Sequence, residues 1–175
     1  MIICPDCNHE NIEGSLECEQ CQQPLSEYLV TPTSSIEEGL LTDRIRALHP
    51  KTPITVDSST SVGDVLRVLV EKGIGCVVVT EDGQAVGIFS ERDALMRIGT
   101  DAKKFNSRPI AEFMTKNLRT LDPQAKVAFV AQRMDQEGYR HVPIVEENGN
   151  LSGIVSVRDI LRYLTEKLVT GENAT

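Results

Sequence analysis

Tryptophan is absent from this chain of 175 residues, and the only other large aromatic residues are four Phe and three Tyr. A packed core must therefore be built from Val, Ile and Leu, which suits small buried strands under helices. No apolar run approaches the ~18 residues that cross a bilayer, and no basic segment followed by an apolar one opens the chain. We therefore expect a cytoplasmic protein without a membrane partner.

Basic residues are missing from the first part of the chain. Residues 1–43 contain nine Asp or Glu and no Lys or Arg, because the first basic residue is Arg44. The remaining 17 acids and 18 bases nearly balance, although the whole chain carries a formal charge of -8. We expect the N-terminal segment to repel polyanions, whereas the rest of the chain could meet a small anionic ligand.

Four of the five cysteines form two C-x2-C pairs, Cys4 with Cys7 and Cys18 with Cys21. Each pair can form a turn whose two thiolates converge on one tetrahedral ion. Asn8 and Gln22 follow the second cysteine of each pair, where the chain often adopts a left-handed conformation. The short segment has too few large aliphatic residues to fold by burial alone, so a structural metal would stabilise it.

Two disulfides or redox-active thiols are the alternatives to a metal. Disulfides require an oxidising compartment, and a redox C-x2-C usually occurs once, at the start of a helix in a βαβ unit. Zn²⁺ is preferred, and a set of sulfur ligands leaves iron open. His9 could compete as a ligand, but four thiolates already close the shell. Residues 1–25 therefore resemble a zinc ribbon, whose acidity disfavours nucleic acid and favours a protein partner.

A polar linker is expected at residues 26–43, and from residue 44 the chain repeats itself. Each copy reads as strand, helix, hairpin and helix, in a first repeat at residues 44–104 and a second at 105–169, followed by a tail at 170–175. The offset is 65 before the hairpin turn and 66 after it, because the turn holds one extra residue. The matched segments are 45–48 with 110–113, 55–57 with 120–122, 77–79 with 142–144, and 87–93 with 153–159.

The repeat resembles a CBS-domain pair, or Bateman module, and the duplicated G-h-x-S-x-x-D motif at the step from hairpin to helix is its specific part. The resemblance implies an α/β fold of tandem β-α-β-β-α units packed as a pair, joined here to a small N-terminal four-cysteine ribbon. It also implies a regulatory sensor that holds AMP, ADP, ATP or S-adenosylmethionine in clefts between its repeats, often as a head-to-head homodimer.

The motifs Ser90-x-x-Asp93 and Ser156-x-x-Asp159 have two interpretations. A Ser followed three residues later by an acid is a common helix cap. The same geometry also suits a nucleotide, because a helix N-terminus offers N–H donors to phosphate and a carboxylate accepts ribose hydroxyls. Gly87 and Gly153 would leave room for a ligand against the backbone. The recurrence in both copies favours ligand binding.

The resemblance assigns further residues to this ligand site. In the second repeat, the basic residues Arg140 and His141 at the start of the strand could contact phosphates, whereas the first repeat has no basic residue there. The alternative is that this pair is simply solvated at a strand end. The arginines beside the motifs could reach phosphate or pair with acids on their own helices. These further candidates are Arg140, His141, Pro143, Arg92, Arg158, Thr55 and Thr120.

The sequence contains no recognisable catalytic constellation, and Cys76 in its apolar strand is expected to be packing, not a nucleophile. The function predicted is a non-catalytic sensor of an adenosine ligand that passes occupancy to a protein partner. The alternatives are an interaction scaffold that uses the acidic ribbon without nucleotide sensing, and a transcription regulator that acts through the ribbon.

Overall fold

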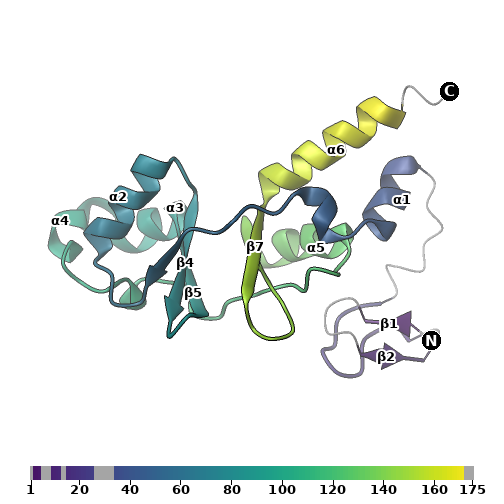
Figure 1. The fold of residues 1–175 in the computed structure, drawn as a ribbon, viewed down its shortest axis with the longest axis horizontal. Coiled ribbons are helices and arrows are strands. Elements are labelled where there is room, and N and C mark those ends of the chain that lie inside the picture. The colour runs from purple at the N-terminus through teal and green to yellow at the C-terminus, as the bar shows by residue number, and fades with distance from the viewer. Residues whose placement is uncertain (1, 5–8, 13–14, 26–33, 172–175) are drawn as a thin grey trace. The chain divides into compact units, whose positions relative to one another are not determined.

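The computed structural model describes residues 2–4, 9–12, 15–25 and 34–171 (Figure 1). The chain forms two compact units, which do not follow chain order. The first-repeat unit comprises residues 52–120 and 145–153, and the second-repeat unit comprises residues 1–51, 121–144 and 154–175. Residues 44–51, which open the first repeat in the sequence, therefore belong to the compact unit of the second repeat.

A three-stranded sheet forms the centre of the first-repeat unit. Strand β4 (Cys76–Glu81) pairs in parallel with β3 (Thr55–Asp57) and antiparallel with β5 (Gln84–Ser90). The first four residues of β4 are buried, as expected for a central strand that is covered on both faces. The two-residue connection between β4 and β5 lies where the sequence predicted the turn.

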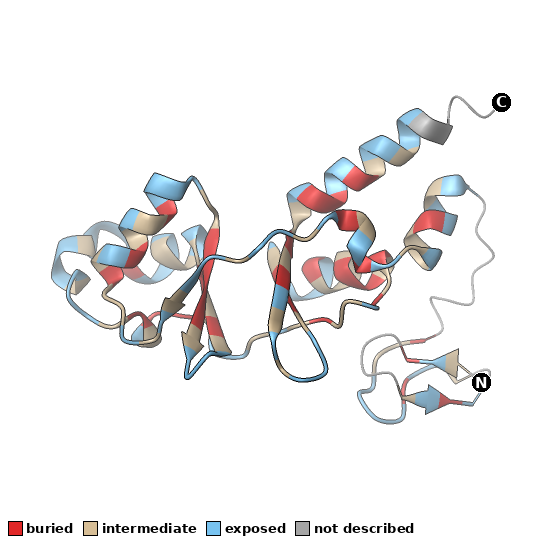
Figure 2. Ribbon diagram, viewed as in Figure 1, coloured by how far each residue is buried: buried red, intermediate tan, exposed pale blue. Residues whose placement is uncertain are grey.

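Helix α2 (Val62–Lys72) covers this sheet, and its ends follow the sequence signals. The Ser61 side chain accepts a hydrogen bond from the N–H of residue 64, and Gly73 ends the helix with φ +59°. The buried face of α2 packs into the core, where buried residues also concentrate along β4 (Figure 2). The core consists of Val62, Val65, Leu69, Val77, Val79, Phe89, Ile98, Ile110, Phe113 and Met114.

The segment after β5 is less regular than the single helix that the sequence predicts. One turn of α-helix, α3 (Glu91–Asp93), passes into a π-helical turn, η3 (Ala94–Ile98). The short helices η4 (Gly99–Asp101), α4 (Ala102–Phe105) and η5 (Ile110–Glu112) follow. A π-helical turn holds one more residue than an α-helical turn. The first repeat therefore has one extra residue in this turn compared with the second repeat.

The second-repeat unit contains part of the corresponding hairpin, β6 (His141–Val145) and β7 (Leu151–Ser156), whose residues 145–153 are assigned to the first-repeat unit. The first strand of the second repeat is reduced to one parallel bridge between Leu121 and Ile144. Helices α5 (Val127–Glu137) and α6 (Val157–Gly171) and the short helix η2 (Ile45–Leu48) complete it. Its core consists of Ile45, Leu48, Leu121, Ala125, Val127, Val130, Met134, Val142, Ile144, Val155, Ile160 and Tyr163.

Two further parts lie near the N-terminus. Strands β1 (Ile2–Ile3) and β2 (Glu10–Asn11) form a small antiparallel ladder. Helix α1 (Ser35–Thr42) lies inside the predicted linker, begins at the Ser34 cap and packs against α5 and α6. The part of the linker at 26–33 lies outside the described residues. Among the helices that the structure describes, none has the length and apolarity needed to span a bilayer.

Candidate functional site

Three cysteines of the N-terminal module converge. The Sγ atoms of Cys4, Cys18 and Cys21 all lie within 4.8 Å of one another, with 3.5 Å between Cys4 and Cys21. A tetrahedral Zn²⁺ with bonds of about 2.3 Å would separate its sulfur ligands by about 3.8 Å. None of the described cysteines forms a disulfide bond. This donor set fits a thiolate-bound metal, and the fourth predicted ligand, Cys7, lies outside the described residues.

Backbone turns hold these thiols in place. The Cys4 N–H donates to the His9 carbonyl at 2.7 Å, and the Cys18 N–H donates to the Gln23 carbonyl at 2.8 Å. Gln22 has φ +60°, the left-handed conformation that the sequence predicts after a C-x2-C turn. The other such position, Asn8, lies outside the described residues.

Asn11 supports the cysteine cluster, and the sequence analysis did not identify it. Its side chain is only 1% exposed, and its amide nitrogen lies 3.6 Å from Cys18 Sγ and 2.9 Å from the His9 carbonyl oxygen. Its amide oxygen accepts a hydrogen bond from the Glu19 N–H at 3.0 Å. Asn11 therefore links the strand β2 to the second C-x2-C turn, in the manner of residues that orient metal ligands.

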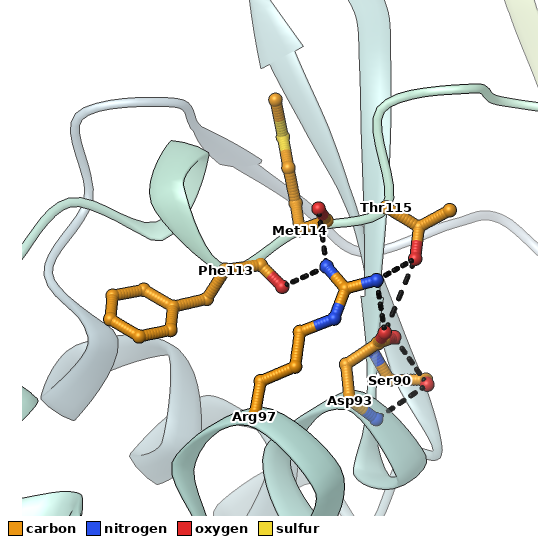
Figure 3. Close-up of polar contacts among 6 residues, drawn as sticks. All are labelled: Ser90, Asp93, Arg97, Phe113, Met114 and Thr115. Atoms are coloured by element: carbon orange, nitrogen blue, oxygen red, sulfur yellow. Dashed lines mark hydrogen bonds and ion pairs between the residues drawn. The ribbon is translucent and has the colours of Figure 1, made fainter.

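The first corner is the segment from Ser90 to Asp93, where β5 passes into α3 (Figure 3). Asp93 Oδ2 accepts hydrogen bonds from the Ser90 N–H at 2.9 Å and the Ser90 hydroxyl at 2.6 Å. Asp93 Oδ1 accepts from the Thr115 hydroxyl at 3.2 Å and lies 3.4 Å from Arg97 Nη2. Ser90 and Asp93 therefore form the helix cap of the first interpretation. The contacts of Asp93 Oδ1 are longer than those of Oδ2.

The second corner is the segment from Ser156 to Asp159, where β7 passes into α6. Asp159 Oδ2 accepts from the Ser156 N–H at 2.8 Å and the Ser156 hydroxyl at 2.6 Å. Its Oδ1 accepts from Arg162 at 2.9 Å and lies 3.8 Å from Lys51 Nζ. Burial alone would raise the pKa of Asp159, but the Ser156 hydrogen bonds, Lys51 and Arg162 together hold it below 3.8.

The chain's own packing requires glycine at position 87, and the expectation that Gly87 also leaves room for a ligand stays a prediction. A Cβ atom on Gly87 would lie 2.5 Å from Met114 Sδ and 2.9 Å from the Thr115 carbonyl oxygen. Thr115 approaches this closely because it pairs antiparallel with Ile88. Gly153 is buried within β7.

The strand-start residues of the second repeat lie beside the second corner. The Arg140 carbonyl accepts a hydrogen bond from the Val157 N–H at 3.0 Å, at the first residue of α6. His141 follows as the first residue of β6 and is half-buried. In the first repeat, the Gly75 carbonyl makes the same contact with Glu91, also at 3.0 Å. The sequence interpretation that only the second repeat has basic residues at this point agrees with these positions.

The other predicted residues have varied environments. Pro143 is buried in β6, and its carbonyl accepts from the Leu121 N–H at 3.1 Å. Arg92 and Arg158 are exposed at the starts of their helices. Thr55 is exposed on β3 and pairs with Val78, whereas Thr120 is half-buried. Their place in a ligand site stays a prediction.

Four residues at the corners were missed by the sequence analysis: Arg97, Thr115, Lys51 and Arg162. A signal for the arginines was present, since Arg97 and Arg162 are 65 residues apart, the offset of the first half of the repeat. The matched segments 87–93 and 153–159 end at Asp93 and Asp159, before these positions.

Cys76 has the properties of a packing residue, as predicted. It is the first residue of β4, is 8% exposed and pairs with Ser90 in the sheet. Burial raises the pKa of its thiol to about 12, with further contributions from the charges of Glu91 and Asp93. The thiol therefore stays protonated at neutral pH, which disfavours nucleophilic chemistry.

The comparisons with known proteins match the repeat region. The CBS domain family model matches residues 45–100 and 110–166. An uncharacterized 17.7 kDa protein of Acidianus ambivalens is 30% identical over 63% of this chain and 66% of its own length. This chain matches 42% to 66% of the length of three curated relatives.

Solved structures with bound adenosine compounds have the same fold. The CBS domain pair of protein MJ0100, in complex with 5'-methylthioadenosine and S-adenosyl-L-methionine, is 30% identical with a TM-score of 0.58, over 67% of this chain and 91% of that one. The CBS domain protein PAE2072 from Pyrobaculum aerophilum, complexed with AMP, is 26% identical with a TM-score of 0.62, over 73% and 98%. This chain therefore belongs to the CBS domain family and carries two copies of the domain.

Proposed function

We propose that this chain is a non-catalytic regulatory protein that binds an adenosine-containing ligand at its Ser/Asp corners and passes the occupancy to a protein partner. The observation that supports this proposal is the recurrence of one arrangement in both units. At each corner the serine before a helix donates its N–H and hydroxyl to an aspartate three residues later, and cationic side chains lie beside the carboxylate. Related CBS proteins bind AMP and S-adenosyl-L-methionine.

The chemistry of the corners suits an adenosine ligand. A carboxylate oxygen accepts hydrogen bonds from ribose hydroxyls, and the N–H groups and positive dipole at a helix start favour phosphate. The second corner has more positive charge around it, with Lys51 and Arg162 at the carboxylate and Arg140 at the first turn of α6. We infer that a phosphate-bearing ligand is better matched to this corner than an uncharged one.

A Ser-x-x-Asp cap elsewhere in the chain provides a matched control. At the start of α2 the Ser61 hydroxyl donates to Asp64 Oδ2 at 2.7 Å, the same hydroxyl-to-carboxylate contact that each corner makes. The Asp64 side chain is 54% exposed, compared with 15% for Asp93 and 2% for Asp159. The cap at α2 therefore stabilises a helix without the enclosed carboxylate of the two corners.

Thermal unfolding with AMP, ADP, ATP and S-adenosylmethionine tests the proposal. Ligand at 100 times its dissociation constant should stabilise the native state by about 2.7 kcal/mol and raise the melting temperature. The Asp93→Ala, Asp159→Ala double variant should lose this ligand response, whereas Asp64→Ala should keep it although it lowers stability. No shift with any of the four compounds, or an equal shift in the double variant, would contradict the proposal.

The proposal includes a structural metal in the N-terminal module. Zn²⁺ held by Cys4, Cys18 and Cys21, with Cys7 as the predicted fourth ligand, would stabilise a segment that buries few aliphatic side chains. Metal content of the purified protein, measured by plasma mass spectrometry, distinguishes zinc from iron. Absence of both metals, with the thiols reduced, would contradict this part.

A scaffold function is the second candidate, and the surface of the N-terminal module favours it. Its aliphatic residues Ile3, Ile12 and Leu16 are exposed, and residues 1–43 carry nine acids without a Lys or Arg. Such a surface suits a partner with apolar and basic groups. Salt-sensitive capture of a partner that depends on Ile12 and Leu16, without any adenosine ligand, would favour the scaffold over the sensor.

The proposal also includes a homodimer. Leu95 and Leu161, 66 residues apart, occupy equivalent positions after the two corners, and both are exposed, as is Met96. Exposed apolar residues that recur in both repeats suit a symmetric interface. Analytical ultracentrifugation should show a dimer that the Leu95→Glu, Leu161→Glu variant converts to a monomer, and a monomeric wild-type protein would contradict it.

A further inference from the structure

Two arginines, one in each unit, make an equivalent contact with the backbone. Arg97 Nη1 donates to the Phe113 carbonyl at 2.7 Å, and Arg162 Nη2 donates to the Leu48 carbonyl at 3.1 Å. The two donors are 65 residues apart, and so are the two acceptors. Both arginines also reach the carboxylate of their corner.

The π-helical turn makes this equivalence possible. The corner aspartates are 66 residues apart, whereas the arginines are 65 apart, so Arg97 is four residues beyond Asp93 and Arg162 only three beyond Asp159. The π-helical turn Ala94–Ile98 takes up the extra residue, and α6 has no such turn. The first repeat thus brings Arg97 to the carbonyl that corresponds to the Leu48 carbonyl of the second-repeat unit, in spite of the extra residue between Asp93 and Arg97.

The two arginines differ in how they bind the carboxylate. Arg97 is held mainly by the backbone, since it also donates to the Met114 carbonyl at 2.6 Å, and it lies 3.4 Å from Asp93 Oδ1 (Figure 3). Arg162 uses the same Nη2 atom for the Leu48 carbonyl and for Asp159 Oδ1, which it meets at 2.9 Å.

This difference decides how readily the Oδ1 atom of each corner can accept a ligand. At both corners the Oδ2 atom is occupied by the hydroxyl and the N–H of the capping serine. Ribose hydroxyls must therefore bind to Oδ1. At Asp93 the Oδ1 contacts are long, at 3.2 and 3.4 Å, whereas at Asp159 a charge-assisted hydrogen bond of 2.9 Å must be displaced.

We propose that Arg97 is a positioning residue that keeps the first corner ready for a ligand, and that Arg162 is a latch that competes with the ligand at the second corner. This inference rests on the proposed function. Arg97 fixes the Thr115 hydroxyl, 3.0 Å from its Nη2, and the backbone that carries it, without saturating Asp93. An adenosine ligand accordingly fills the first corner before the second.

Calorimetric titration with AMP, and separately with S-adenosylmethionine, tests this order. The Asp159→Ala variant leaves only the first corner, and Asp93→Ala leaves only the second. Adding Arg97→Gln to the former should weaken binding by about tenfold, and adding Arg162→Gln to the latter should strengthen it by about tenfold, the effect of one hydrogen bond to a charged group. Arg67→Gln, which removes only the ion pair with Asp64 on α2, should change neither affinity.

The opposite signs of the two effects are the decisive result. If both arginine variants weaken binding, or if the second corner of the wild-type protein binds more tightly than the first, the latch is overturned while the proposed function stands. Absence of binding of both compounds to the wild-type protein would remove the proposed function and this inference with it. Where Arg162→Gln does not fold, Arg162→Lys provides the same comparison, because a single ammonium cannot hold the Leu48 carbonyl and Asp159 with the arginine geometry.

Discussion

The hydroxyl of Tyr163 on α6 donates a hydrogen bond of 2.8 Å to Asp43, the residue that ends α1. The same carboxylate oxygen lies 2.8 Å from Lys167 Nζ, one turn further along α6. Tyr163 is 4% exposed, and burial raises the pKa of its hydroxyl, with Asp43 raising it further. Through Asp43, this partly buried network joins α1 to the helix that begins at the second corner.

Removal of the Tyr163 hydroxyl should therefore loosen α1. We expect Tyr163→Phe to lower the free energy of unfolding by about 1–2 kcal/mol, since it removes a partly buried hydrogen bond to a charged group, while the ion pair of Asp43 with Lys167 remains. Urea denaturation followed by circular dichroism measures this change. Tyr139→Phe, the same substitution away from the network, is the control, and an equal loss in both variants would show that the Asp43 contact is not the cause.

Much of the fold was predictable because local signals agree with the tertiary structure. Ser61 and Gly73 mark the two ends of α2, and the turn between β4 and β5 lies where Asp82 and Gly83 predict it. The repeat itself predicts the corresponding elements of both units. The Ser/Asp corners were predictable for the same reason, since each motif begins at the last residue of a strand and ends in the first turn of the next helix.

The remaining features depend on contacts between segments distant in the sequence. Helix α1 is short and contains Glu37, Glu38 and Gly39, so the sequence there resembles a linker. Its buried side becomes evident only where Gly39 lies against Tyr163. Thr115 reaches Asp93 from a different segment, and Lys51 reaches Asp159 across more than one hundred residues. No local pattern predicts such pairs, which only the packed units bring together.

The stability of the protein should depend on the ionisation of Asp159. The pKa of Asp159 in the folded protein lies below the ordinary 3.8. The charged carboxylate therefore stabilises the native state at pH values above the pKa of the unfolded chain. This contribution is lost as the pH falls through the pKa of the folded protein. We expect the free energy of unfolding to decrease as the pH falls from about 5 to about 3, a range that includes the reference pKa of aspartate. The Asp159→Asn variant should show a shallower decrease in denaturant titrations, and Asp135→Asn on the exposed face of α5 is the control. An unchanged slope in Asp159→Asn would contradict this assignment.

Asn11 should determine how tightly the cysteine cluster holds the proposed metal. Its amide lies against Cys18 Sγ and fixes the Glu19 backbone, so Asn11→Ala removes an orienting contact but leaves every thiol in place. We expect about 10- to 100-fold weaker metal binding, the usual effect of such supporting residues. Competition with a chromophoric chelator measures the affinity, and the absorption of the Co²⁺-loaded protein reports the thiolate geometry. Glu10→Gln, an exposed neighbour on β2, should bind metal as the wild type does, and equal affinities in both variants would remove the role of Asn11.

The Cys76 thiol should resist alkylation in the native protein. With a pKa of about 12, about one thiol in ten thousand is ionised at pH 8, and the residue is also enclosed in β4. Incubation with iodoacetamide, followed by peptide mass spectrometry, should leave Cys76 unmodified, whereas the same reagent should label it after denaturation in guanidinium. Because Glu91 and Asp93 contribute to the raised pKa, Asp93→Asn should lower it slightly, but burial, the larger cause, should keep the thiol unreactive. Rapid labelling of Cys76 in the folded protein would mean that β4 opens at the first corner, since the thiol pairs there with Ser90.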